Sequence, residues 1–275
     1  MQYLQAASRR ALAEARERLD SYLDEAAEAD AERLGEELFA AVDLLSGQPV
    51  LRRHLADPST DARDRTRLLG AIFGGKLSQP AMQVLEGMVA ARWSQPRDLM
   101  VAAETLGRLA VLAVAQRQGA IEDVEDELFR AGRLIDREPR LRSLLADLSV
   151  PAAKRVELLR SVLAGKVHPT TERLLVRAVQ APHGISLDRA AEQLADLAAE
   201  RRQRSVARVR TPVALTDDQQ ERLAAALSRI YGRGMSLQIE LDEELIGGLV
   251  VRVGDEVIDG SLAGRLAAAR QRLPR

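Results

Sequence analysis

The sequence predicts a mainly α-helical protein that ends in a small α/β module. Before about residue 205, apolar residues recur at helical spacing, and prolines fall between the segments, where they start or stop helices. After it, apolar and polar residues alternate as in half-buried strands. We therefore expect two tandem helical bundles, residues 1–104 and 105–204, followed by a β-α-β-β-α module at 205–275.

Helical periodicity is clearest in two places. LGEELFAAVDLL (34–45) puts Leu34, Leu38, Ala41, Val42 and Leu45 on one face. No proline interrupts 97–138, which predicts a long helix to about Gln118, a break at Gly119 and a new helix that opens with EDVEDE. Acidic residues in a first turn complement the helix dipole, which supports this second start.

An internal repeat organises the helical part. Residues 37–91 align without gaps on residues 127–181, ninety residues later, and about twenty of the pairs are identical. Such self-similarity predicts two related bundles in tandem. The helix around 100–116 closes the first copy and precedes the second as its opening helix should. We therefore hypothesise that both bundles share it, which would join them rigidly.

The C-terminal module is predicted from strand, turn and cap patterns. VARVRTPV (206–213), SLQIELD (236–242) and LVVRVGDEVID (249–259) alternate like strands, the last as a hairpin around Gly254-Asp255. Between the first two, TDDQQERLAAALSRIYG is expected to be a helix with a capping box formed by Thr216 and Gln219. Ser261 is expected to cap a short final helix.

Composition excludes several classes of function. Forty basic and 41 acidic residues leave a formal net charge of −1, so no global charge favours nucleic acid or an anionic membrane. The chain has no cysteine, and its three histidines are scattered, which disfavours a metal site. No apolar run approaches the roughly twenty residues that span a bilayer. We expect a cytoplasmic protein that does not insert into a membrane.

No catalytic constellation is found. GAIFGGKL (70–77) resembles the start of a phosphate-binding loop, but Leu77 stands where Ser or Thr is needed, and a helix rather than a strand is predicted before it. A helix C-cap explains these glycines better. The arginine-rich RRQRSVARVR (201–210) lacks the aromatic residues of a nucleic-acid site. We therefore assign no catalytic, cofactor-binding or metal-binding residue.

The stretch LIGGLVVRVGDEVIDGSL (245–262) invites a chemical interpretation, with a glycine pair beside a strand and Asp259 as a possible acid. No helix N-terminus follows Gly247-Gly248 to complete a phosphate cradle. The pair is better explained by a bulge or a close approach of two backbones. Asp259 is expected to bond backbone amides rather than to transfer protons.

This C-terminal stretch resembles the signature of the delta subunit of bacterial F-type ATP synthases, the family of the mitochondrial oligomycin sensitivity-conferring protein. The match extends from LDEELIGG to the Asp-Gly-Ser before the last helix, and the segment 109–159 resembles the start of an ordinary delta subunit. Residues 1 to about 100 are an addition, as in the long delta subunits of actinobacteria. The signature residues are Asp242, Leu245, Ile246, Gly247, Gly248, Gly254, Asp255, Asp259, Gly260 and Ser261.

The resemblance implies a non-catalytic stator subunit without a cofactor, peripheral at the cytoplasmic face of the cell membrane. Its helical domain would receive the N-terminal helices of the alpha subunits, and its C-terminal part would meet the b subunits of the peripheral stalk. An amphipathic partner helix requires an apolar groove. We expect exposed apolar positions on the helix around 104–118 to contribute, with Leu109 and Leu112 as candidate contacts.

Two other classes of protein remain as alternatives. A free-standing helical-repeat adaptor, unconnected with energy coupling, would show the same helical repeat. An enzyme is disfavoured by the missing catalytic groups. Association with the head and stalk subunits of ATP synthase would discriminate among the three classes.

Overall fold

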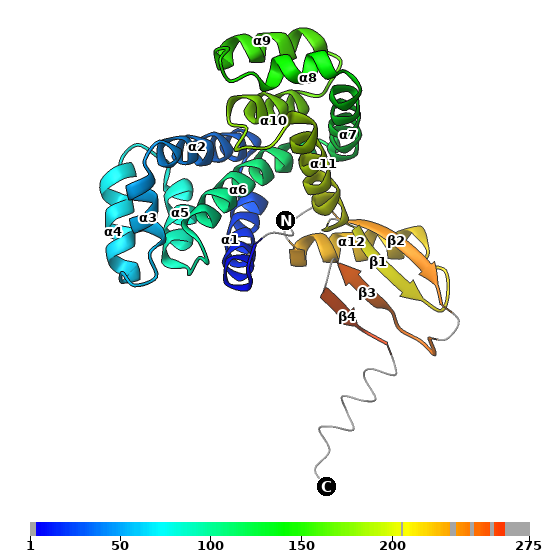
Figure 1. Cartoon of the computed structure of the whole chain (residues 1–275). Coiled ribbons are helices and arrows are strands. Elements are labelled where there is room, and N and C mark those ends of the chain that lie inside the picture. Colours follow the sequence, from blue (N-terminus) through cyan, green and yellow to red (C-terminus); the bar gives the residue numbers. More distant parts are fainter. Residues whose placement is uncertain (1–3, 205, 232–234, 243–244, 254–255, 262–275) are drawn as a thin grey trace. The chain divides into compact units, whose positions relative to one another are not determined.

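The computed structural model describes residues 4–204, 206–231, 235–242, 245–253 and 256–261. The chain divides into two compact units, Met1–Ala198 and Ala199–Arg275. Its described part is mainly helical, with twelve helices and one four-stranded sheet of mixed direction (Figure 1). The predicted fold class is confirmed at this level. The expected boundary at 104/105 lies inside a helix, so the three-part division stays a prediction.

Helices of the first unit follow the predicted pattern of starts and stops. Proline occupies the first turn of five of the described helices, where its missing N–H costs no hydrogen bond. The described helices, of which the last extends past residue 198, are α1 (Ala6–Glu25), α2 (Glu28–Ser46), α3 (Pro49–Ala56), α4 (Ala62–Phe73), α5 (Gln79–Ala90), α6 (Pro96–Arg117), α7 (Ile121–Arg137), α8 (Pro139–Ala146), α9 (Ala152–Leu163), α10 (Pro169–Gln180) and α11 (Leu187–Arg204).

Three consecutive helices recur at the repeat distance. Helices α8, α9 and α10 begin and end ninety residues after α3, α4 and α5, since 49, 62 and 79 become 139, 152 and 169. Local contacts recur as well. Glu37 accepts a hydrogen bond from the backbone N–H of Ser78, and Glu127 accepts one from that of His168, ninety residues after Ser78.

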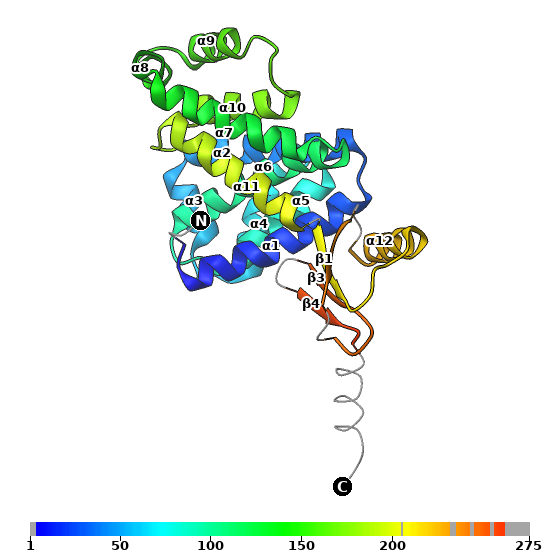
Figure 2. The same ribbon diagram turned by 90° about the vertical axis from the view of Figure 1, so that its right-hand side faces the viewer.

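Helix α6 is continuous from Pro96 to Arg117 and lies in the middle of the first unit. It packs against α1, α2, α3 and α5 on one side and against α7 and α10 on the other (Figures 1 and 2). One hydrophobic cluster, from Leu4 to Ala198, runs through both groups of helices. The prediction of one long helix here is confirmed, and no loop interrupts it between residues 100 and 116.

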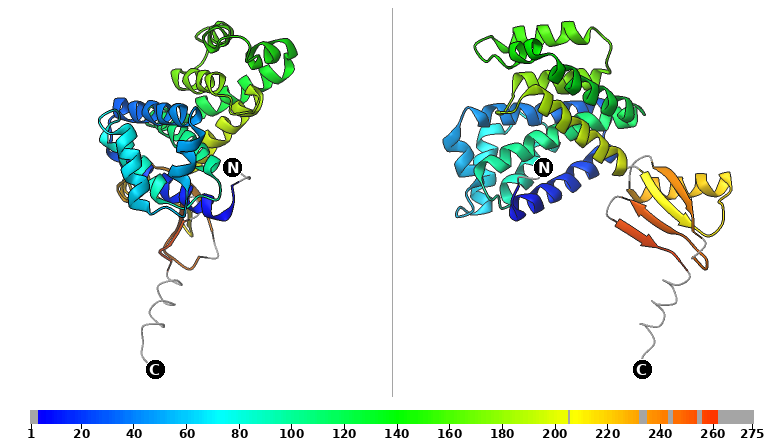
Figure 3. Two further views of the ribbon diagram at one scale, coloured as in Figure 1. Left: turned by 60° about the vertical axis from the view of Figure 1, so that its left-hand side comes forward. Right: turned by 45° about the vertical axis from the view of Figure 1, so that its right-hand side comes forward.

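The second unit contains the sheet. Its described elements are β1 (Val206–Thr211), α12 (Asp217–Tyr231), β2 (Ser236–Leu241), β3 (Val250–Val253) and β4 (Glu256–Asp259). The strand order is β2-β1-β3-β4, with β1 and β2 parallel and the other pairs antiparallel. Helix α12 lies on one face of the sheet (Figure 3). Leu227 belongs to one hydrophobic cluster with Val209 and Val251, and Leu223 packs against this cluster.

Local predictions in this unit can be compared with the structure. The capping box is confirmed, because the N–H of Thr216 donates to Gln219 and the N–H of Gln219 donates to Thr216 Oγ1. Strands β3 and β4 pair as the predicted hairpin, with Val253 opposite Glu256. The turn residues Gly254 and Asp255, and the final helix expected after Ser261, lie outside the described residues.

Candidate functional site

The glycines of the C-terminal signature bring two backbone segments together. Gly248 has φ +83°, and a Cβ added to it would lie 2.4 Å from the carbonyl oxygen of Gly260 and 2.9 Å from the Cα of Ser261. The N–H of Gly260 donates to the carbonyl of Leu249 at 3.0 Å. Any side chain at position 248 would displace this contact, so the glycine serves a close backbone approach rather than a phosphate cradle.

The acidic residues of the signature are engaged in local contacts. Asp259 accepts a hydrogen bond from the N–H of Ser261 at 2.9 Å, and its hydrogen bonds with the side chain and backbone of Ser261 lower its pKa. Asp242 accepts one from Arg210 Nε at 2.8 Å, and its own N–H donates to Thr211. A carboxylate with a lowered pKa is a poor proton donor near neutrality, so this geometry is that of a structural turn.

Other signature positions differ widely in exposure. Ile246 is 86% exposed, whereas Leu245 and Gly247 are intermediate. Gly254 and Asp255 lie outside the described residues. Single exposed apolar side chains are common on protein surfaces, so the exposure of Ile246 does not by itself indicate a site.

Leu109 and Leu112 do not lie on an exposed face. They are 6% and 0% exposed, and every residue of α6 from Ala102 to Ala115 is buried. The expectation of exposed apolar positions on this helix is therefore wrong, because helices of both groups cover α6. A helix that is apolar on all sides is usually buried. The run LAVLAVA (109–115) is apolar on all sides, so the sequence itself indicated that this part of α6 is buried. Partner contact through the two leucines stays a prediction.

A cluster of charges joins α2, α6 and α10, with Glu104, Arg108 and Arg177 buried and Asp43 at its exposed edge. Glu104 of α6 accepts three hydrogen bonds from Arg177 of α10, the shortest at 2.8 Å, and lies 3.3 Å from Arg108. Arg177 also donates to Asp43 of α2 at 2.8 Å, and its guanidinium lies 4.7 Å from the ring centre of Phe39. The cluster therefore ties the helices before α6 to those after it.

The electrostatics of Glu104 follow from this cluster. Burial alone raises the pKa of its carboxyl, but hydrogen bonds from His183 and Arg177 and the charges of Arg108 and Arg177 outweigh burial, and the pKa is about 2. Burial lowers the pKa of Arg177, yet its bonds to Glu104 and Asp43 raise it overall. All three side chains of the Glu104–Arg177–Arg108 group stay ionised at neutral pH, and none is free to transfer a proton.

The Gly-Lys stretches are helix ends. In both copies a helix, α4 or α9, precedes the glycine, and no strand precedes it among the residues that the structure describes. Lys76 donates to the carbonyl of Ile72 at 2.9 Å, in the last turn of α4. The predicted C-cap interpretation is therefore confirmed, and the nucleotide interpretation is wrong.

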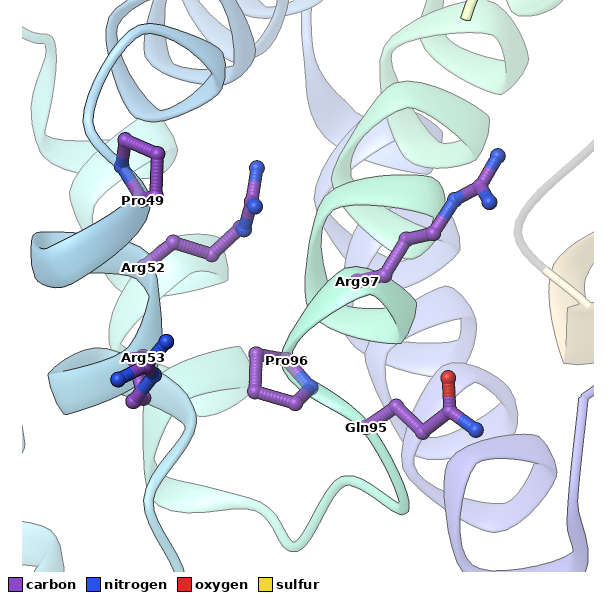
Figure 4. Close-up of a pocket in the computed structure, with 6 residues that line it drawn as sticks. All are labelled: Pro49, Arg52, Arg53, Gln95, Pro96 and Arg97. Carbon is purple, nitrogen blue, oxygen red and sulfur yellow. The ribbon is translucent and has the colours of Figure 1, made fainter. Parts of the chain in front are cut away.

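A small cationic cavity of about 250 Å³ lies between α3 and the start of α6. Arg52 and Arg53 project from α3 and Arg97 from the first turn of α6 (Figure 4). Neither Gln48 nor Gln95, the residues before these helices, makes a side-chain cap. The site attracts negative charge in general, but among its described lining residues no acid or nucleophile stands beside the arginines.

A larger apolar groove lies along α7 and the end of α9. Its volume is about 690 Å³, and Phe129 and Leu134, 54% and 46% exposed, contribute to its wall. Within the described residues, no group of three or more histidine, cysteine or acidic side chains is placed to hold a metal ion. None of the described helices has the length and apolar character needed to cross a membrane.

Comparison with known proteins identifies the family. Residues 109–273 match the model of the ATP synthase delta (OSCP) subunit. The chain belongs to this family. The delta subunit of Streptomyces avermitilis is 49% identical over 97% of both chains, and that of Corynebacterium efficiens is 46% identical over 98% of both. A chain of the Toxoplasma gondii mitochondrial ATP synthase hexamer matches 61% of this chain and 96% of its own length, at 19% identity and a TM-score of 0.32.

Family membership defines the role of the chain. It is a delta/OSCP subunit, a non-catalytic structural component of the peripheral stalk of F-type ATP synthase. The alternatives of a free-standing adaptor and of an enzyme are thereby set aside. Its resemblance to actinobacterial delta subunits is confirmed over nearly the full length, including the residues before the family match.

Two functional features escaped the sequence analysis. The charge cluster was missed although Glu104 and Arg108 stand four residues apart on an otherwise apolar helix, a pattern that indicates a buried pair. The groove on α7 was missed because Phe129 aligns with Phe39, and an alignment alone does not tell which of two matched residues is exposed. Only the packing shows that Phe39 is 3% exposed and Phe129 is not buried.

Proposed function

We propose that this delta subunit connects the catalytic head to the b subunits of the peripheral stalk and resists the torque of the rotor. Its helical unit would receive N-terminal helices of the alpha subunits, and its C-terminal unit would meet the b subunits. The complex would place it at the cytoplasmic face of the cell membrane, without insertion of this chain. No nucleic acid or cofactor is part of the proposal.

The observation that supports this role best is the single hydrophobic core of the helical unit. Residues from Leu4 to Ala198 belong to one cluster, with α6 buried along most of its length. Close-packed interiors deform little under load. The helices before and after α6 would therefore transmit force as one block, as a stator requires.

We also propose that the helical unit is a duplication in which α6 serves both copies. The ninety-residue recurrence of α3–α5 in α8–α10 supports this, as do the matched contacts of Glu37 and Glu127. A stator would gain from such sharing, because a common helix leaves no hinge between the copies. The added copy then lengthens the block.

Reconstitution tests the stator role. Complexes of head, membrane sector and b subunits are prepared with and without this chain, and ATP-driven proton pumping is measured together with ATP hydrolysis. We expect hydrolysis in both samples and pumping only when the chain is present. Full pumping without the chain would contradict the proposal.

A further inference from the structure

An open groove lies along α7 and the end of α9. Its volume of about 690 Å³ falls within the range of roughly 300–1,000 Å³ that small-molecule sites occupy. Its apolar lining consists of Phe129, Ala131, Leu134, Val162, Leu163 and Val167. Phe129 and Leu134 are 54% and 46% exposed, whereas Leu163 belongs to the hydrophobic core. The groove therefore extends from the surface of the helical unit down to its core.

The two halves of the helical unit differ in the size of the side chains at this place. Helices α4 and α9 are equivalent, since they begin and end ninety residues apart. The apolar side chains at the end of α9 and just after it are all smaller than their counterparts, the pairs being Ile72 and Val162, Phe73 and Leu163, and Leu77 and Val167. Phe73 is 3% exposed, so its ring fills space in the first half. Side-chain atoms removed from an otherwise similar backbone leave a hollow.

Charge differs at the same place. Three positions on or next to α2 that carry no positive charge correspond to arginines on α7, the pairs being Ala40 and Arg130, Asp43 and Arg133, and Gly47 and Arg137. All three arginines line the groove, and so does Lys166. Glu127, the carboxylate among the described lining residues, already accepts hydrogen bonds from Thr171 at 2.6 Å and from the backbone N–H of His168. The second half therefore gains positive charge where it loses apolar volume.

The arginines form a positively charged edge beside the hollow. The guanidinium of Arg133 lies 6.0 Å from the ring centre of Phe129, at the open side of the groove, and Arg130 pairs with Asp126. In the described part of the chain, Arg137 pairs with no carboxylate. The lining therefore has a net positive charge and attracts anions.

We propose that this groove binds a single-chain amphiphilic anion, such as a fatty acid, with the acyl chain in the hollow and the carboxylate at the arginine edge. The two differences from the first half carry the proposal, because each supplies one part of a site for such a ligand. An acyl chain bends freely and follows an irregular hollow, and its burial contributes free energy in proportion to the apolar area covered. The inference goes beyond the stator role and does not depend on it.

Calorimetric titration of the full chain tests the inference. Octanoate, decanoate and dodecanoate are titrated at neutral pH, together with decyltrimethylammonium as a ligand of matched chain length and opposite charge. We expect each added methylene to tighten binding about three- to fourfold until the hollow is filled. Decanoate is expected to bind about 10-fold more tightly than the cation. Equal affinities for the anion and the cation, or affinities that do not change with chain length, would overturn the proposal.

Two variants copy residues of the first half into the second. Val162→Ile/Leu163→Phe/Val167→Leu restores the larger side chains, and we expect this triple variant to abolish decanoate binding. Arg133→Asp restores the acid of position 43 and is expected to weaken decanoate binding about 3- to 10-fold. Arg63→Asp, at an exposed position of α4, is the charge control and is expected to bind decanoate like the wild type.

Circular dichroism and urea midpoints establish that each variant is folded. If the triple variant does not fold, Arg133→Asp alone decides. Wild-type affinity for decanoate in a folded triple variant, or in Arg133→Asp, would overturn the assignment of the groove.

An anionic membrane and a second copy of the chain are the competing occupants. Phosphatidylglycerol vesicles are sedimented with the chain, and we expect no cosedimentation; cosedimentation that Arg133→Asp abolishes would overturn the proposal. Sedimentation velocity is expected to show a monomer, because two positively charged edges repel each other. A dimer that the triple variant dissociates would also overturn it. The chain's own residues 262–275 contain four arginines and no acidic side chain, so they do not match the edge.

Discussion

Helices α2 and α7 have aligned sequences, yet the aromatic face of α2 is buried and the corresponding face of α7 is partly exposed. On α2, Phe39 is 3% exposed, because Gly107 of α6 lets the two helices approach closely. On α7, Phe129 is 54% exposed. Position 197, ninety residues after Gly107, is a leucine and offers no equivalent gap by its size. One repeat pattern thus produces a core in one place and a surface in the other, according to what its neighbours supply.

Alanine substitution of the two phenylalanines should show the largest difference in stability between the α2 and α7 faces. Phe39→Ala removes a buried ring and is expected to cost about 3–5 kcal/mol of unfolding free energy. Phe129→Ala removes a half-exposed ring and should stay within about 0.5 kcal/mol. Urea denaturation of both variants measures the difference. Equal losses would mean that the two faces do not differ in packing.

Gly107→Leu copies the residue at 197 into the first half. It places side-chain atoms where the ring of Phe39 lies, so we expect a loss of about 3 kcal/mol from overpacking. Phe39→Ala in the same chain should relieve part of the clash, so that the double variant loses less than the sum of the two single variants. Strict additivity would refute the close contact between the two positions.

Glu104→Gln tests the charge cluster that closes the α2 face. Arg108 and much of the bonding of Arg177 lose their partner, and we expect a loss of roughly 2–3 kcal/mol at neutral pH. The pKa of Glu104 is about 2 in the folded chain, below its ordinary value of 4.5, so its contribution is present above pH 4.5 and is lost as the pH falls toward 2.

Stability of the wild type and of Glu104→Gln should therefore converge between pH 4.5 and pH 2. Urea midpoints measured across this range check the sign. A gap between the two proteins that widens on acidification would contradict the assigned pKa.

Glu37→Gln and Glu127→Gln test the helix-start hydrogen bond that occurs in both halves of the helical unit. Each carboxylate accepts a backbone N–H at the start of α5 or α10, at 3.1 and 2.8 Å. We expect losses of about 1 kcal/mol each, similar in the two halves. Urea denaturation measures both, and a loss confined to one half would weaken the duplication hypothesis.

Much of the fold was predictable because helix boundaries are local. Prolines and acidic first turns located most starts, and the repeat placed α8 and α9 where α3 and α4 predict them. The capping box of Thr216 likewise depends only on nearby residues. Such features need no knowledge of what packs against the chain.

The interaction surfaces were harder to predict because they depend on neighbours distant in sequence. Periodicity identified the buried stripe of α2, but it does not say that Gly107 lies opposite Phe39. Leu109 and Leu112 were expected at the surface, but both are buried. Helices of both groups pack around α6, and this arrangement cannot be inferred from the sequence of α6 alone. A bulge or a close backbone approach was expected at Gly247-Gly248, but only the structure identifies Gly260 and Ser261 as the residues that approach Gly248.

Cysteine labelling tests most directly the claim that the α7 face binds a small ligand while the α2 face is closed. The chain has no cysteine, so Leu134→Cys and Leu44→Cys give single labels at two partly exposed positions ninety residues apart. Maleimide labelling rates are compared in the free chain and in the presence of saturating decanoate. We predict similar rates in the free chain and protection of position 134 alone when decanoate is bound. Equally rapid labelling of position 134 with and without decanoate would contradict the account.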